Sequence, residues 1–134
     1  MISNPKCGWC DFKLGTFEGT PSYLTSVPVD LLGAFLSYHH CGIGTAWFDE
    51  EGSYFTLVIT PCSLFIIEEK EEPILHDFSE MNIEDLAKEL ISDIESDFDG
   101  WVDFDASDDA MRSFNRDSIR SRLNRLKRHI EMEV

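Results

Sequence analysis

The sequence predicts an α+β protein in which an antiparallel β-meander of about four or five strands carries about three helices on one face. Between residues 44 and 78, three runs of aromatic and β-branched residues are separated by two charged turns. Elsewhere, apolar residues recur at helical spacing. A chain of 134 residues with 43% hydrophobic residues is large enough for one core, so we expect a single domain over residues 1–134.

The N-terminal third is expected to supply short strands and then a helix. Residues 10–18 alternate partly between apolar and polar side chains, and residues 23–27 are a candidate for a second short strand. Pro28 suits the first turn of a helix, where its missing N–H is not needed. Gly42 stands where a helix stop is expected, so this broadly apolar helix ends near Cys41.

The meander is expected to follow the first helix. Residues 54–60 and 64–67 are apolar in succession rather than alternating, which is typical of central strands. Residues 74–78 form the third run, and we expect it nearer an edge.

The C-terminal half predicts two helices joined by an acidic loop. Asn82 is a good N-cap for a helix that runs to about Phe98, with Asp85 close to a capping-box position. Residues 99–109 are expected to form the loop. Ser107 is the expected cap of the last helix, whose apolar residues are Met111, Phe114, Ile119, Leu123, Leu126 and Ile130.

The charge is strongly negative and unevenly distributed. The net charge is −15, and residues 61–105 hold 15 acidic side chains against 2 basic ones. Such a field repels nucleic acid and anionic membranes and attracts basic partners. The chain shows neither an apolar run long enough to cross a bilayer nor an N-terminal secretory pattern, so we expect a cytoplasmic protein.

A partner-binding patch is expected where aromatic residues lie among carboxylates. The charges would steer a basic protein and the rings would anchor it. The alternative is that both rings point into the core. The expected patch consists of Asp93, Asp97, Asp99, Trp101, Asp103, Phe104 and Asp105.

The basic residues of the last helix are the nearest counter-charge to this acidic segment. We expect Arg116, Arg120 and Arg125 to pair with the carboxylates of residues 93–105 rather than with nucleic acid. If they neutralised those carboxylates, the expected patch would not be free to bind a partner.

Zinc is the one cofactor that the sequence leaves open. A Cys-x-x-Cys pair can share a zinc ion, but a structural site needs four ligands. Because the pair precedes a strand rather than a helix, a thioredoxin-like redox site is not expected. The candidate ligands are Cys7, Cys10, His39, His40 and Cys41. Otherwise these cysteines are reduced structural thiols, and no cofactor is expected.

Two further sites are weaker. Cys41 beside His40 suggests a thiol enzyme, but adjacent helix residues do not face each other, and a helix C-terminus is expected to raise the thiol pKa. Residues 95–106 resemble an EF-hand calcium loop, with acidic residues at positions one, three, five and nine and Gly100 at position six. Glu95 at position one and Ala106 at position twelve depart from the calcium-binding pattern.

The sequence therefore favours a non-enzymatic, acidic protein-interaction module. It contains no phosphate-binding glycine loop, serine elbow or metalloprotease motif. In charge and size it is similar to bacterial immunity proteins, which are small acidic α+β inhibitors of basic toxins. The alternatives are a zinc-stabilised module and an uncharacterised thiol enzyme.

Overall fold

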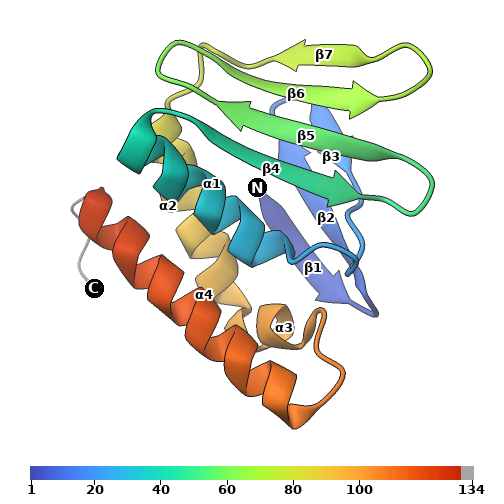
Figure 1. Ribbon diagram of the computed structural model, residues 1–134, viewed down its shortest axis with the longest axis vertical. Coiled ribbons are helices and arrows are strands. Elements are labelled where there is room, and N and C mark those ends of the chain that lie inside the picture. Colours follow the sequence, from blue (N-terminus) through green and yellow to red (C-terminus); the bar gives the residue numbers. More distant parts are fainter. Residues whose placement is uncertain (131–134) are drawn as a thin grey trace.

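The computed structural model describes residues 1–130 and shows an α+β fold (Figure 1). Within these residues there are two antiparallel sheets, one of three and one of four strands, and four helices. None of the described helices has the length and apolar character needed to cross a membrane. In chain order the elements are β1 (Ile2–Lys6), β2 (Trp9–Leu14), β3 (Phe17–Gly19), α1 (Val27–Cys41), β4 (Gly44–Asp49), β5 (Tyr54–Ile59), β6 (Leu64–Glu69), β7 (Ile74–Asp77), α2 (Ile83–Ser96), α3 (Phe98–Asp103) and α4 (Asp109–His129).

The expected meander is confirmed as the four-stranded sheet β4-β5-β6-β7. β5 and β6 are its two central strands, as their continuous apolar sequence predicts, and β7 lies at an edge. Its inner face buries Phe48, Phe55, Leu57 and Ile66 completely. These side chains alternate with outward-pointing ones because successive residues of a strand face opposite sides.

The N-terminal strands form a separate sheet rather than extending the meander. Residues 23–27 are not a strand, and in their place the first residues of the chain form β1, which pairs with β2. The two sheets pack face to face through aromatic rings: the ring centroid of Phe12 lies 5.8 Å from that of Phe48 and 5.0 Å from that of Phe55. In Figure 1 the β1–β3 sheet passes behind β4–β7.

Helix α1 ends as predicted and leads directly into β4. Gly42 adopts a φ of 84°, and its N–H donates to the carbonyl of Tyr38, which closes the helix. Two residues later, Gly44 lies against the backbone of α1. A β-carbon built on Gly44 would stand 1.9 Å from the carbonyl oxygen of Ala34, so only glycine fits this contact.

The acidic segment after α2 is more ordered than a loop. Asn82 caps α2 by accepting the N–H of Asp85 at 2.9 Å, as predicted. The expected loop contains the short helix α3, which Asp97 caps by accepting the N–H of Gly100. An EF-hand loop over residues 95–106 is therefore wrong, because α2 and α3 occupy most of it.

Helix α4 packs along α1 and α3 and completes the core (Figure 1). Its cap is Asp108 rather than Ser107, since the Asp108 carboxylate accepts the N–H of Met111 at 2.8 Å. Of its expected apolar stripe, the residues from Ile119 onward are buried, whereas Met111 and Phe114 are exposed.

Candidate functional site

The outward face of the four-stranded sheet is largely apolar, and no other element of residues 1–130 covers it. We call it the open face, and it consists of Thr45, Trp47, Tyr54, Thr56, Val58, Phe65, Ile67 and Leu75. Strand register aligns Trp47, Thr56, Ile67 and Leu75 in one row across all four strands. Trp47 is 44% exposed and Leu75 is 60% exposed, while Val58, Phe65 and Ile67 are half-buried. The open face is therefore a continuous surface rather than scattered residues.

Such a surface is unusual for an antiparallel sheet. A sheet with one solvated face normally alternates apolar and polar residues, and continuous apolar runs belong to strands that are covered on both faces. β5 and β6 have the sequence of strands covered twice, yet in residues 1–130 only their inner face is covered. Contiguous exposed apolar residues of this kind mark interaction sites.

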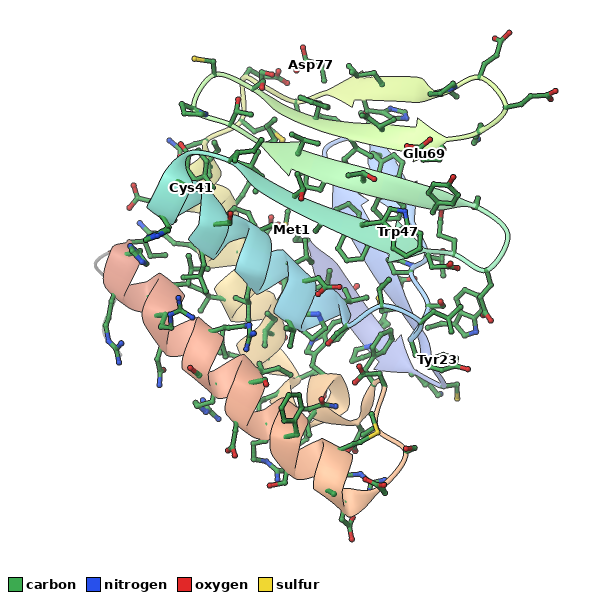
Figure 2. The ribbon with its side chains drawn as sticks, in the orientation of Figure 1. Met1, Tyr23, Cys41, Trp47, Glu69 and Asp77 are labelled. Carbon is green, nitrogen blue, oxygen red and sulfur yellow. The ribbon has the colours of Figure 1, made fainter. Side chains whose placement is uncertain are left out.

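Aromatic side chains occupy the corner of the open face nearest its acidic end. The rings of Trp47 and Tyr54 lie with their centroids 5.5 Å apart, and both are more than two-fifths exposed. Figure 2 labels Trp47 on β4 and Glu69 on β6 near this corner, and Asp77 at the opposite end of β7. Aromatic residues supply much of the binding energy in protein interfaces.

Carboxylates lie along the end of the sheet next to that corner. The register pairs Tyr54 with both Asp49 and Glu69, so the β4–β5 and β6–β7 turns lie at the same end of the sheet. We call the carboxylates of these two turns the acidic rim: Asp49, Glu50, Glu51, Glu69, Glu71 and Glu72.

The acidic rim has little internal neutralisation. Lys70, the basic residue between the two pairs of glutamates, lies 3.3 Å from Glu68 on the inner face. Burial opposes ionisation of Glu68, but hydrogen bonds from His76 and Lys70 outweigh it, so the pKa of Glu68 falls below its usual value. Among residues 1–130, Glu51, Glu69, Glu71 and Glu72 form no ion pair. Their charge is directed to solvent beside exposed aromatic rings.

The patch expected from the sequence is wrong in its aromatic members. Trp101 is only 1% exposed and Phe104 only 7%, and their rings pack against each other at 5.7 Å. The reason is helix α3, which ends at the cap residue Phe104 and packs against α4. It turns both rings inward, beneath the acidic side chains of the segment. Neither ring is available to a partner in this structure.

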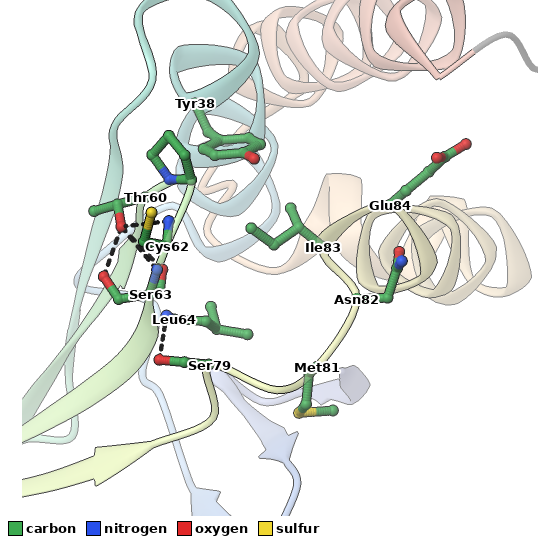
Figure 3. A pocket seen from close by; sticks show the side chains of 11 residues that line it. Tyr38, Thr60, Cys62, Ser63, Leu64, Ser79, Met81, Asn82, Ile83 and Glu84 are labelled. Carbon is green, nitrogen blue, oxygen red and sulfur yellow. Dashed lines mark hydrogen bonds between the residues drawn. The ribbon is translucent and has the colours of Figure 1, made fainter.

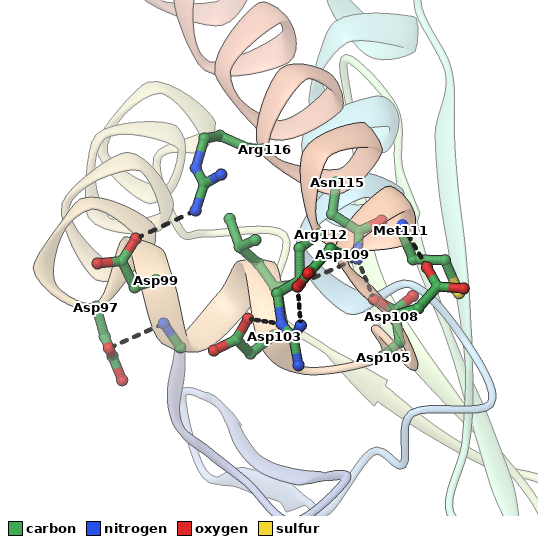
Figure 4. A network of polar contacts seen from close by, with 12 residues as sticks. Asp97, Asp99, Asp103, Asp105, Asp108, Asp109, Met111, Arg112, Asn115 and Arg116 are labelled. Atoms are coloured by element: carbon green, nitrogen blue, oxygen red, sulfur yellow. Dashed lines mark hydrogen bonds and ion pairs between the residues drawn. The ribbon is translucent and has the colours of Figure 1, made fainter.

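The carboxylates of that patch each have a partner within the chain, and Figure 4 shows the partners of Asp97, Asp99, Asp103 and Asp105. Asp93 accepts from the amino group of Met1 at 2.6 Å, and Asp97 caps α3. Asp103 pairs with Arg112 at 2.9 Å, and Asp105 accepts from the amide of Asn115 at 2.8 Å. Asp99 lies 4.0 Å from Arg116, the weakest of these contacts. The acidic segment is thus largely satisfied internally.

The arginines of α4 make only part of the pairing that the sequence predicts. Arg116 approaches Asp99 as expected, but the guanidinium of Arg120 lies over the ring of Phe98 at 4.2 Å. Arg112 was not among the predicted partners, yet it binds both Asp103 and Asp109. The position of α3 explains the difference, because it places Asp103 beside the first turns of α4.

Two half-buried carboxylates, Asp30 of α1 and Asp105, lie close enough to interact. Burial, and then the charge of Asp105, raise the pKa of Asp30, while Arg122 lowers it less. Burial also raises the pKa of Asp105 against hydrogen bonds from Asn115 and Ser26.

Asp30→Asn is therefore expected to stabilise the protein at neutral pH. A carboxyl whose pKa is higher in the folded state favours folding most when it is protonated, so the wild-type protein loses stability as pH rises through that pKa. The expected gain in the free energy of unfolding at pH 7 is a few tenths to about 1 kcal/mol. It should shrink at acidic pH, as the wild-type carboxyl takes up a proton in the folded state. Urea unfolding at both pH values measures it, with Asp117→Asn on the exposed side of α4 as the control for net charge. An equal gain at both pH values would contradict this account.

The proposed zinc ligands are not brought together. Cys7 and Cys10 lie at the β1–β2 turn, while His39, His40 and Cys41 lie at the far end of α1 (Figure 1). Burial raises the pKa of the Cys10 thiol to about 12, which opposes the thiolate that zinc binding needs. Among residues 1–130, no three histidine, cysteine or acidic side chains are grouped to hold a metal ion.

The pKa of the Cys41 thiol shifts in the direction opposite to the one expected from the sequence. Hydrogen bonds with Ser37, and then with the Ile43 backbone, lower the pKa of the exposed Cys41 thiol, whereas the helix C-terminus was expected to raise it. The ring of His39 is stacked on His129 of α4 at 5.5 Å. Burial, and then the charge of His129, lower the pKa of His39.

A polar hollow of about 310 Å³ lies between the β5–β6 turn and the start of α2 (Figure 3). Its hydroxyl groups bond to one another and to backbone: Thr60 contacts Ser63 at 2.6 Å, and Ser79 accepts the N–H of Leu64 at 3.1 Å. These contacts hold the turn in place. They do not form a nucleophile paired with a base.

A scan against protein-family models, a search of curated proteins and a search of solved structures found no match to this chain.

The strongest candidate site is therefore the open face with its acidic rim. The two charged turns and the apolar strands are visible in the sequence, but there they indicate only the fold. The signal that marks them is that apolar and polar residues do not alternate along β5 and β6. This signal becomes informative only once one face of the sheet is known to be uncovered.

Proposed function

We propose that this chain is a non-enzymatic protein-interaction module that binds a basic protein through the open face and the acidic rim. The observation that carries the proposal is an apolar sheet face that nothing else in residues 1–130 covers, with an exposed aromatic corner beside carboxylates that form no ion pair within those residues. Apolar and aromatic residues supply binding energy when they are desolvated, and the surrounding charge selects and steers the partner.

The charge of the whole chain supports a basic partner. A net charge of −15 attracts cationic proteins over distances longer than a contact and accelerates their association at low salt. Because the carboxylates of residues 99–105 are engaged by Arg112, Arg116 and Asn115, the acidic rim is the better-placed source of that field at a binding surface. Inhibition of a basic toxin by a bacterial immunity-type protein is one activity of this kind, and it stays a prediction. A zinc-stabilised module and a thiol enzyme stay alternatives that depend on residue types alone.

Trp47→Ala is expected to weaken binding of the partner by about tenfold or more, the loss typical of an aromatic anchor in an interface. Phe114→Ala is the matched control, because Phe114 is a 70% exposed aromatic residue on α4, outside the open face. Affinity capture from the native lysate with wild-type and both variant proteins in parallel should retain the same basic protein on wild type and Phe114→Ala only. Binding kinetics with that purified protein then give the affinities.

A second pair of variants tests the charge. Glu69→Lys and Asp117→Lys change the net charge equally, but only Glu69 belongs to the acidic rim. Glu69→Lys should slow association and reduce its salt dependence, whereas Asp117→Lys should have a small effect.

For the aromatic pair, equal effects of Trp47→Ala and Phe114→Ala on the captured partner would contradict the proposed surface.

A further inference from the structure

Strand β7 forms a free edge of the four-stranded sheet. It pairs with β6, and no other strand among residues 1–130 pairs with its far side. Figure 1 shows β7 at the margin of the molecule. Ile74 and Leu75 are exposed, so the edge is apolar as well as unpaired. An exposed edge of this kind is a template for another strand.

The pairing of β7 with β6 determines which N–H and C=O groups of β7 point toward the free edge. The N–H of Phe78 donates to the carbonyl of Leu64 at 2.7 Å, and hydrogen-bonded pairs recur every second residue in an antiparallel ladder. His76 and Ile74 are therefore bonded to β6. The residues between them, Leu75 and Asp77, turn their N–H and C=O groups toward the free edge.

Carboxylates stand on both sides of this short edge. Glu71 and Glu72 precede β7, and Asp77 and Glu80 lie at its other end. Two basic residues close to this edge in the sequence, Lys70 and His76, are both engaged by Glu68. An extended segment that adds along β7 would thus meet negative charge at both of its ends, which favours lysine and arginine side chains.

We propose that the partner binds by β-strand addition: an extended basic segment pairs with β7 as a fifth strand and continues the open face. Main-chain hydrogen bonds to Leu75 and Asp77 supply affinity, and alternate side chains of the added strand lie beside Leu75 on the open face. This inference depends on the proposed function, because it names how the basic partner reaches that surface.

The test uses a synthetic peptide of alternating lysine and valine, about seven residues long, which is a typical strand length. Its matched control carries N-methyl groups on alternate backbone amides, which keeps the charge but removes the donors needed for pairing. Two N-methyl versions are needed, because the orientation of the added strand decides which alternate amides face β7. One version is methylated on the odd-numbered amides and the other on the even-numbered amides. Titration should show binding of the unmodified peptide and about ten- to hundredfold weaker binding of one N-methyl version.

A pair of protein variants isolates the edge itself. Leu75→Pro removes an N–H that points away from β6, whereas Leu75→Ala keeps this N–H and removes most of the side chain. We expect Leu75→Pro to abolish peptide binding and Leu75→Ala to weaken it less. Melting curves check that both variants fold. On the wild-type protein, hydrogen exchange should show that the Leu75 and Asp77 amides become protected when the peptide binds.

The outcomes separate the two proposals. Peptide binding that Trp47→Ala weakens, but that N-methylation and Leu75→Pro leave unchanged, would overturn strand addition while supporting the open face as the binding surface. If the wild-type protein binds none of the three peptides, strand addition is overturned as well. The capture experiment with Trp47→Ala then decides the proposed function independently.

Discussion

Gly44→Ala is expected to lower the free energy of unfolding by about 3 kcal/mol, in the upper range for overpacking. The new β-carbon would stand 1.9 Å from the Ala34 carbonyl oxygen and 2.7 Å from its carbonyl carbon. Both atoms belong to the backbone of α1, so no side-chain rotation relieves the contact. The helix would have to move away from β4, which would open the core between them.

Gly33→Ala is the matched control on the same helix. A β-carbon on Gly33 meets no atom within 4 Å, and alanine favours helix over glycine, so this variant should gain about 0.5–1 kcal/mol. Urea unfolding followed by circular dichroism measures both variants. A Gly44→Ala protein as stable as wild type would mean that α1 and β4 are farther apart than described here.

Trp101→Ala is expected to lower the free energy of unfolding by about 3–5 kcal/mol, the range for removing a buried aromatic side chain. Trp101 is 1% exposed and packs with Phe104 beneath the acidic residues of α3. The loss should appear as a lower urea midpoint with unchanged slope.

Trp101→Phe separates a core role from a binding role. Among residues 1–130 the indole N–H of Trp101 has no hydrogen-bond partner, so phenylalanine keeps most of the packing and removes an unsatisfied donor. We expect a loss within about 1–2 kcal/mol for this variant, less than half the loss for alanine. If Trp101→Ala left stability unchanged and weakened partner binding instead, the ring would belong to the surface patch that the sequence predicts.

The parts of the fold that the sequence predicts correctly are those with strong local signals. The meander follows from apolar runs and charged turns, and α2 follows from the Asn82 cap and a regular apolar stripe. The division into two sheets has no such signal. It depends on contacts between Phe12 and the distant Phe48 and Phe55, which no local pattern reports.

The sequence names the kinds of residue that make up the candidate site, but not where they lie. Its prediction, which stays a prediction, is that carboxylates and aromatic rings combine to bind a basic partner. It places them at residues 93–105, because Trp101 and Phe104 look exposed in an acidic loop. The short helix α3 reverses that expectation, since six helical residues suffice to turn both rings inward. Trp47 and Tyr54, by contrast, look like ordinary strand residues until the tertiary structure leaves their face bare.

The acidic rim also bears on how copies of this chain meet one another. A bare apolar sheet with an unpaired edge is the kind of surface on which identical chains stack and precipitate. Glu51, Glu69, Glu71 and Glu72 stand at the margin of that surface, so two copies approaching face to face would bring like charges together. We therefore expect these glutamates to act as gatekeepers, which oppose self-association and so preserve the colloidal stability of the protein.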